Sequence, residues 1–377
     1  MSGATVHFVV PDGIDDATQV SGGNVYDRRL REALRGRGWD VRSMSVPVAR
    51  SGALSQAISR LPDDSLVLID GLLAVAASAV LAAHSTRLRI VVLAHMVAGA
   101  MTGAGPGAMP GAMPGAGDGG ETAAHEREAL GAARRVIATS GWTRSELVAR
   151  GIADADRIAV ARPGTDAAPA ATGSEHGPSL LCVGAVTAHK GQDLLVEALA
   201  GLSDLPGWTC TVVGSLQADP DFALRTSAVI GAARLSARIA LTGVLTGDRL
   251  ADAYAASDLV VAPSRVESYG MVVAEALARG IPVVAARVGG IPEAIAGSGA
   301  GILVPANDPQ TLRVELRQWC SNADRRASLK AEALRSRGGA RRWDETAAIV
   351  AAVLRAARDE GSSTTTRAVD SGRRRAG

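Results

Sequence analysis

Two glutamates, Glu267 and Glu275, stand eight positions apart in the segment SRVESYGMVVAEALARG. The apolar residues before this segment predict a strand, and the next helix should begin at Gly270. The backbone N–H groups of Gly270, Met271 and Val272 would then be unpaired at a helix start, an arrangement that binds phosphate. Alone, two glutamates at this spacing are typical of solvated helix charges. The helix start between them adds a candidate phosphate site.

A lysine stands at the start of another predicted helix. In LLCVGAVTAHKGQDLLVEAL a strand should end at Val183, and Lys190 with Gly191 comes directly before the helix. A P-loop requires glycine before lysine, so the reversed order excludes a Walker-type nucleotide site. Ligands of open α/β sheets bind at the carboxyl ends of the strands, where Lys190 and Glu267 should both lie. A cation at this place suits a pyrophosphate leaving group.

The segments that position these residues alternate between short β-branched runs and longer helical stretches. The predicted strands are 6–10, 40–44, 66–69, 90–94, 135–139, 158–161, 180–183, 209–213, 239–242, 259–262, 283–285 and 301–304. The clearest predicted helices are 26–37, 191–200, 248–256, 270–278 and 343–358. This alternation is typical of doubly wound, parallel α/β sheets, and it occurs twice.

The chain should therefore form two Rossmann-like domains, residues 1–168 and 179–342, joined by a segment rich in Pro, Gly and Ala. A helix within 343–360 is expected to cross back to the N-terminal domain, and 361–377 should be a disordered tail. Residues 99–120 contain nine glycines and are expected to be a flexible flap on the acceptor side, or a passive insertion.

Composition excludes several classes of protein. The 377 residues carry a net charge of only +2 and include ten aromatic residues, which does not favour nucleic-acid binding. The longest apolar stretch, 72–83, has twelve residues, short of the roughly 20 of a transmembrane helix. The N-terminus resembles a first strand and not a signal peptide. We therefore expect a cytoplasmic protein.

No metal site is predicted. The three cysteines are far apart and form no CxxC pair. Two Asp-x-Asp tripeptides, 154–156 and 219–221, are expected to be chance occurrences in a helix-to-strand loop and in a turn.

The chemistry-bearing residues occur in a pattern that resembles a known family. Val183-Gly184 with Lys190-Gly191, then Gly243-Val244-Leu245, then Glu267-Ser268-Tyr269-Gly270 and Glu275 resemble the nucleotide-binding half of GT-B retaining glycosyltransferases of family 4. The N-terminal half agrees, because Gly22-Gly23 before the first helix, His95 after the strand 90–94 and the segment 136–151 are similar to that family. The resemblance implies the GT-B fold, with two Rossmann-like domains facing across a cleft.

The resemblance also implies a role for each matching residue. Glu267 would bind donor-sugar hydroxyls and Glu275 the ribose, while His95 would orient the sugar from the opposite side of the cleft. Lys190 and the amides of Gly270, Met271 and Val272 would hold the diphosphate. The remaining implied donor-binding residues are Gly22, Gly23, Leu245 (through its main chain) and Tyr269.

The implied activity is retaining transfer of a sugar from a nucleoside-diphosphate sugar, with no cofactor or metal. GDP-mannose is expected ahead of UDP-glucose, and the acceptor is unidentified, for example a glycolipid such as a phosphatidylinositol mannoside. Two alternatives stay open: a GT-B sugar-nucleotide epimerase or phosphorylase, and a non-catalytic nucleotide-sugar binding protein. The second is favoured by Ala185, which stands where many relatives have a phosphate-binding arginine. His189 or Arg265 could substitute for it.

Four arginines gather around the first predicted helix, Arg28, Arg29, Arg31 and Arg35. They form either a solvated basic face or a surface for peripheral contact with an anionic membrane, such as the inner face of the plasma membrane.

Overall fold

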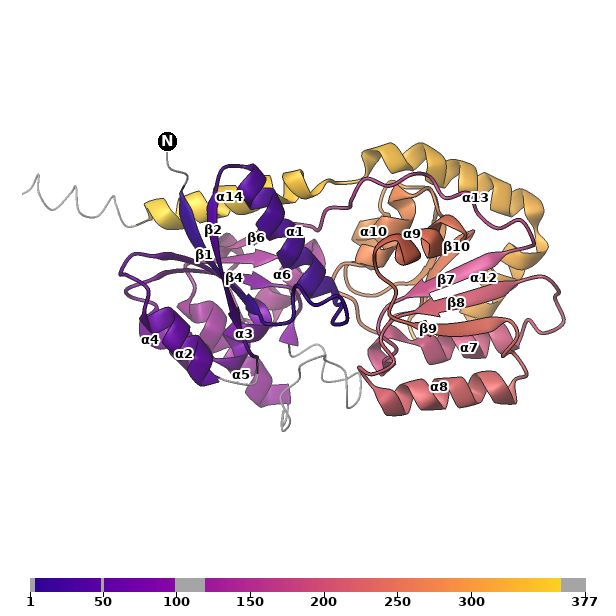
Figure 1. Cartoon of the computed structure of the whole chain (residues 1–377), viewed down its shortest axis with the longest axis horizontal. Helices are drawn as coiled ribbons and strands as arrows, with labels where there is room; N and C mark the ends of the chain where they lie inside the picture. Colours follow the sequence, from indigo (N-terminus) through magenta and orange to yellow (C-terminus); the bar gives the residue numbers. More distant parts are fainter. Residues whose placement is uncertain (1–3, 49–50, 99–118, 361–377) are drawn as a thin grey trace, which may run out of the picture.

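The computed structural model describes residues 4–48, 51–98 and 119–360. It contains two six-stranded sheets, and every ladder between the described strands is parallel. The two sheets and their helices form two bodies, one from the first part of the chain and one from the second (Figure 1). The glycine-rich flap, except residues 119 and 120, and the expected tail lie outside the described residues.

The first sheet has the strand order β2-β1-β3-β4-β5-β6. Its strands are β1 (Thr5–Pro11), β2 (Asp40–Val46), β3 (Leu66–Asp70), β4 (Arg89–Ala94), β5 (Arg135–Ala138) and β6 (Ile158–Val160). The associated helices are α1 (Gly22–Gly36), α2 (Ser51–Ser59), α3 (Gly71–Ala76), α4 (Ser78–His84), α5 (Gly119–Ala132) and α6 (Gly141–Ala149). Alternate strand residues face opposite cores: Val9 packs in one buried cluster and Phe8 in another. Such burial on both faces explains the continuous apolar strands.

The second sheet has the order β12-β11-β10-β7-β8-β9. Its strands are β7 (Ser179–Val183), β8 (Thr209–Val213), β9 (Ile239–Gly243), β10 (Leu259–Ala262), β11 (Val283–Ala286) and β12 (Gly301–Val304). Its helices are α7 (Gln192–Ala200), α8 (Pro220–Ala232), α9 (Gly247–Ala255), α10 (Met271–Ala278), α11 (Ile291–Ile295), α12 (Pro309–Ser321) and α13 (Ala323–Ser336). The direction of the strand order reverses between β7 and β10, and a crevice at such a point is where doubly wound sheets bind ligands.

The last helix, α14 (Trp343–Asp359), packs on the first sheet although it follows the second in the chain (Figure 1). Ala347, Val350 and Leu354 of α14 lie in the same buried cluster as Phe8 of β1. The Trp343 ring meets the edge of the Tyr26 ring at 5.3 Å between centroids. The C-terminal helix therefore ties the end of the chain to its beginning.

All twelve predicted strands form, with ends within two residues of the prediction. The predicted helices also form, but α7 and α10 begin one residue later than expected. Gly191 and Gly270 instead adopt positive φ angles of 71° and 95° immediately before these helices. The helix α1 begins earlier than predicted, at Gly22, because the Ser21 side chain accepts a hydrogen bond from the Asn24 amide.

Two further expectations about local structure were wrong. Asp219, expected in a turn, is the N-cap of α8, where its side chain accepts a hydrogen bond from the Phe222 amide at 3.0 Å. Residues 119 and 120, expected in the flap, belong to α5. No helix in the described ranges is long and apolar enough to cross a membrane.

Candidate functional site

Lys190 and Glu267 meet at the point where the strand order of the second sheet reverses. Lys190 lies in the loop after β7 and Glu267 in the loop after β10, and Lys190 Nζ lies 2.7 Å from Glu267 Oε2. Burial raises the pKa of the Glu267 carboxyl, but the charge of Lys190 and its hydrogen bond outweigh this and hold that pKa below its usual value. A small cavity beside the pair is lined by Gln192, Gly270 and Val272 among others.

The helix α10 begins at the same cavity. Gly270 is its N-cap and therefore offers no side chain to the helix amides. Met271 and Val272 are the first two helical residues, so their N–H groups belong to the unpaired first turn. The structure thus places a helix N-terminus next to the Lys190–Glu267 pair, at the sheet edge where the sequence analysis expected both residues.

Glu275 lies one turn further along α10. Its Oε2 accepts a hydrogen bond of 2.8 Å from the hydroxyl of Tyr254, a fully buried residue of α9. Burial raises the pKa of the Glu275 carboxyl, and the Tyr254 hydrogen bond opposes that shift. Leu245, in the loop after β9, is partly buried against the same apolar cluster as Tyr254. Tyr269 is also buried.

The first sheet contributes residues from the opposite body. A methyl group placed on Gly22 would lie 3.7 Å from the sulfur of Met271, so this glycine approaches the start of α10 closely. A methyl group placed on Gly23 would lie 3.5 Å from the ring of His95. The structure therefore brings Gly22 of the first body next to the start of α10 in the second, with Gly23 lying beside His95.

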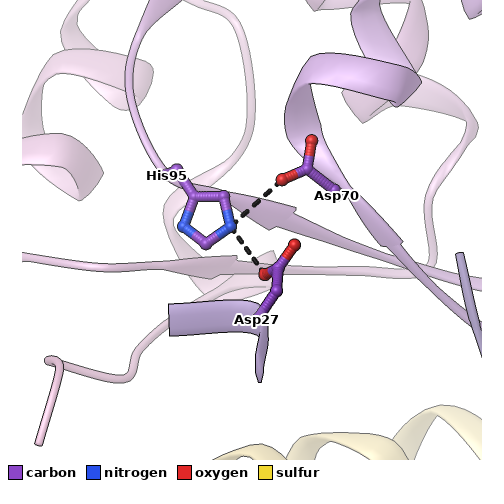
Figure 2. A group of neighbouring side chains, drawn as sticks. All are labelled: Asp27, Asp70 and His95. Atoms are coloured by element: carbon purple, nitrogen blue, oxygen red, sulfur yellow. Dashed lines mark hydrogen bonds and ion pairs between the residues drawn. The ribbon is translucent and has the colours of Figure 1, made fainter. Parts of the chain in front are cut away.

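His95 lies between two carboxylates that the sequence analysis did not single out (Figure 2). Its Nε2 is 2.8 Å from Asp27 Oδ1 and 3.1 Å from Asp70 Oδ2. Burial lowers the pKa of His95, but the two carboxylates outweigh it and raise that pKa far above its usual value. Burial also raises the pKa of Asp27, whose side chain is fully enclosed. The two carboxylates therefore favour the protonated, imidazolium form of the ring.

Asp27, Asp70 and His95 are also the one group in the described ranges whose ligand atoms lie close enough to hold a metal, within 4.8 Å. The spacings of Nε2 from both carboxylates are ordinary hydrogen-bond lengths, which suit an imidazolium shared by two carboxylates. Asp70 is further engaged, because its Oδ1 accepts hydrogen bonds from the first amides of α3. The position of Asp70 at the carboxyl end of β3 was the sequence signal that could have revealed it.

Neither residue considered as a replacement for the missing arginine is a free cation. Burial, followed by the charge of Lys190, lowers the pKa of His189 to about 4, so its ring is neutral. The guanidinium of Arg265 makes two hydrogen bonds of 2.8 Å to Asp193 and one to Asn307. Ala185 thus leaves Lys190 without a second cation from either residue.

Glu293 of α11 connects the two bodies, which the sequence analysis also missed. Its carboxylate accepts hydrogen bonds from the amides of Gly141 (3.0 Å) and Trp142 (2.7 Å), the first residues of α6. It also lies 2.9 Å from Arg162 Nε. A carboxylate at a helix N-terminus is stabilising, so this contact anchors one body to the other.

The arginines around α1 are largely engaged by protein groups. Arg29 pairs with Glu32 and Asp166, and Arg31 pairs with Asp15 through both guanidinium nitrogens. The remaining two, Arg28 and Arg35, donate to the backbone carbonyls of Ile14 and Val41 respectively. Arg29 and Arg31 are thus paired with carboxylates, whereas Arg28 and Arg35 donate to neutral carbonyl groups.

Comparison with known proteins agrees with this geometry. Residues 166–336 match the model of the family described as Glycosyl transferases group 1. A D-inositol 3-phosphate glycosyltransferase of Catenulispora acidiphila is 33% identical over 63% of this chain and 61% of its own length. The corresponding protein of Rhodococcus opacus is 34% identical over 58% of this chain and 53% of its own length. The chain thus spans between about half and three fifths of the length of these curated relatives.

Solved structures of similar fold include sucrose-phosphate synthase from Thermosynechococcus elongatus, with 20% identity and a TM-score of 0.76. That match covers 93% of this chain and 98% of the other. HepE from Anabaena, solved with UDP and glucose, has 17% identity and a TM-score of 0.72, covering 94% of this chain and all of the other. The family match shows that residues 166–336 belong to the group 1 glycosyl transferases, and the solved structures show that the chain has the GT-B fold.

Proposed function

We propose that this protein is a retaining hexosyltransferase that uses a nucleoside-diphosphate sugar. The observation that carries the proposal is the meeting of Lys190, Glu267 and the start of α10 where the strand order of the second sheet reverses. A lysine and unpaired helix amides form an anion site, while Glu267 and Glu275 supply acceptors for hydroxyl groups. The match to the glycosyl transferase family supports the interpretation of this anion site as a site for a nucleoside-diphosphate sugar.

Each residue then has a distinct role. Lys190 and the amides of Gly270, Met271 and Val272 hold the diphosphate. Glu267 binds sugar hydroxyls. Lys190 and Glu267 pair with each other in the structure, and in the complex the diphosphate becomes the partner of Lys190.

The remaining positions complete the donor site. Glu275 binds the ribose, and Leu245 contacts the base through its main chain. Gly22 and Gly23 allow the first body to approach the donor without a Cβ, and Tyr269 is a further donor-binding residue. His95 faces the sugar as an imidazolium held by Asp27 and Asp70.

The proposed reaction takes place on one face of the sugar. The acceptor hydroxyl oxygen forms a bond to the anomeric carbon while the bond from that carbon to the diphosphate oxygen breaks. The electron pair of the broken bond stays on the diphosphate, which also receives the acceptor proton. The protein contributes Lys190 and the helix amides, which stabilise the growing charge, and the positioning of both substrates.

The donor and acceptor are proposed as classes. The sequence favours GDP-mannose and then UDP-glucose, and the structures of similar fold include one solved with UDP and one with ADP. The relatives are named for D-inositol 3-phosphate, which supports an inositol phosphate as the acceptor, either free or as a phosphatidylinositol lipid headgroup. The two acceptors share one chemistry and differ in the presence of a lipid.

The first test measures binding and turnover together. Thermal unfolding is recorded with UDP, GDP and ADP and with their hexose derivatives, because a ligand at 100 times its Kd stabilises by about 2.7 kcal/mol. Release of the nucleoside diphosphate is then followed with D-inositol 3-phosphate, with phosphatidylinositol vesicles, and without acceptor. Release that requires an acceptor supports the transferase. Release without one indicates an epimerase or a hydrolysing side reaction.

The chain offers a matched control, because Lys330 is its only other lysine. Lys330 is half-buried, and within the described residues its side chain donates to the Thr172 carbonyl at 3.2 Å. Lys190→Met should lower the rate of acceptor-dependent release by about 30- to 1000-fold, and Lys330→Met should not change it. Tight donor binding without turnover for any acceptor would favour the non-catalytic alternative. Ala185, which provides no second cation for the diphosphate, is the residue that would explain such a loss of activity. The proposal fails if none of the three nucleotides raises the melting temperature.

A further inference from the structure

The side chain of Tyr254 determines where Glu275 can point. The Tyr254 ring is fully buried among apolar residues of α10 and β10, including Val273 and Val260. Its hydroxyl donates to Glu275 Oε2 at 2.8 Å. Burial raises the pKa of the Tyr254 phenol well above its usual value, so the hydroxyl keeps its proton and acts as the donor.

Arg279 supports both members of this pair. Its guanidinium carbon lies 4.4 Å from the centre of the Tyr254 ring, a cation–π contact. Its Nη1 also donates to the backbone carbonyl of Glu275 at 3.0 Å. The ring, the arginine and the glutamate are thus packed as a unit, and rotation of the Glu275 side chain would break the bond to Tyr254.

With Oε2 engaged by Tyr254, Glu275 keeps one oxygen free. Its Oε1 has no hydrogen-bond partner within the described part of the chain. A carboxylate with one oxygen anchored and the other open is pre-organised to accept hydrogen bonds from a pair of neighbouring hydroxyl groups.

We propose that Tyr254 is a positioning residue of the donor site, which holds the Glu275 carboxylate so that its free oxygen receives the ribose hydroxyls of the nucleotide. This inference rests on the proposed function, which places the ribose at Glu275. Tyr254 itself does not touch the nucleotide. It removes the cost of ordering a glutamate side chain at the moment of binding.

The experiment compares ribose recognition in two proteins. Binding of UDP, GDP and ADP, each beside its 2′,3′-dideoxy counterpart, is measured by calorimetry with the wild type and with Tyr254→Phe. In the wild type the dideoxy nucleotide should bind about 10-fold more weakly, the effect of losing hydrogen bonds to a charged acceptor. In Tyr254→Phe the natural nucleotide should bind several-fold more weakly, and the ratio between natural and dideoxy nucleotide should shrink toward one.

The pH dependence of nucleotide binding is a second measurement, and a simple loss of packing around Tyr254 would not change it. The hydrogen bond from Tyr254 lowers the pKa of Glu275, so its removal raises that pKa further. Arg279 and Arg29 lower the same pKa and Asp166 raises it, and all three remain in the variant. Because ribose recognition needs the carboxylate, the pH below which nucleotide binding weakens should be higher in Tyr254→Phe. Its kcat at saturating donor should be nearly unchanged.

Ser257→Ala is the matched control. Ser257 lies two residues after the end of α9 and is buried, and among the described residues its hydroxyl donates to the Ala253 carbonyl at 2.6 Å, so the variant also loses a buried hydroxyl near that helix. It should keep the wild-type ratio and pH profile. If Tyr254→Phe discriminates against the dideoxy nucleotides as strongly as the wild type does, the role of Tyr254 is overturned, and the assignment of Glu275 to the ribose still stands. No discrimination against the dideoxy nucleotides in the wild type would instead remove Glu275 from the ribose, and with it the proposed site.

Discussion

Replacing Lys190 by methionine should affect the rate of transfer and the stability of the fold by separable amounts. Lys190 meets charge that grows on the leaving diphosphate, so its loss removes transition-state stabilisation. By comparison with the loss of other donors to a developing anion, the cost is about 2–4 kcal/mol, which corresponds to a fall in kcat of about 30- to 1000-fold. The KM for the donor should change less than kcat.

The stability effect follows from the Lys190–Glu267 ion pair. The two side chains are 27% and 20% exposed, so the pair lies between a surface pair and a fully buried one. Removing one partner of a buried pair costs roughly 3–5 kcal/mol and a surface pair contributes under about 1 kcal/mol. We therefore expect Lys190→Met to lower the free energy of unfolding by about 2 kcal/mol at pH 7. Lys190→Met with Glu267→Gln should regain most of that stability and none of the kcat.

The pH dependence of this loss has a defined sign. In the wild type the pKa of Glu267 is held below its usual value, so its charge stabilises the fold at neutral pH and this contribution disappears as the pH falls through the lowered pKa. Without Lys190, burial dominates and the pKa of Glu267 rises above its usual value. The charged form then destabilises the fold until it is protonated. The gap in unfolding free energy between wild type and variant should therefore narrow from pH 7 to pH 4.

Urea unfolding at both pH values, together with initial rates at saturating donor, measures these quantities. Lys330→Met provides the baseline for loss of a lysine from this chain. A Lys190→Met protein with wild-type kcat would show that the lysine does not meet the leaving group. A stability gap that widens on acidification would show that the Lys190–Glu267 pair does not control the charge of Glu267.

Four further outcomes are expected. Ala185→Arg should tighten donor binding by about 10-fold in calorimetry, because it restores a second cation beside the diphosphate, and unchanged or weaker binding would place that cation elsewhere. Glu293→Gln should lower the unfolding free energy by about 1–3 kcal/mol, because the carboxylate accepts from the amides of α6 and pairs with Arg162, and a value near zero in urea titration would rule out the anchor. Asp27→Asn should lower the pKa of His95, so the NMR titration of this ring should move toward neutral pH, whereas an unmoved titration would contradict the charge pairing. Turnover should be the same in EDTA and in manganese, and a rate restored only by manganese would show that the anion site needs a metal.

The local elements were predictable because their causes are local. The central strands β3, β4 and β11 are short apolar runs that are almost completely buried, so apolar continuity marked them within two residues. The edge strand β2 buries only Val41 and Val46 and was marked by fewer apolar residues. Helices with glycine at their start were located almost as well. The helix α8 was missed because the Asp219-Pro220 pair can open either a turn or a helix, and only the hydrogen bond from the Phe222 amide shows which.

The position of the family motifs at the sheet edge could also be predicted from the sequence, for a related reason. Lys190, Glu267 and Glu275 each follow a strand end or lie on the helix after it, and parallel strands bring their carboxyl ends to one edge. The order of strands around β7 and β10, which the spacing does not encode, decided that Lys190 and Glu267 are neighbours at 2.7 Å.

The partners of these residues depended on packing between distant segments. Asp27 is 68 positions from His95, and Glu293 is 152 positions from the Gly141 amide that it accepts from. Tyr254 and Glu275 are 21 positions apart on two different helices. In the sequence, the carboxylates and the hydroxyl of these three residues cannot be told from other polar side chains. Their charge state and orientation are set only in the folded protein, where burial removes water and a specific partner takes the place of that water. Residue type and spacing thus predicted which groups meet the nucleotide, and the tertiary contacts alone decided which groups hold those residues in place.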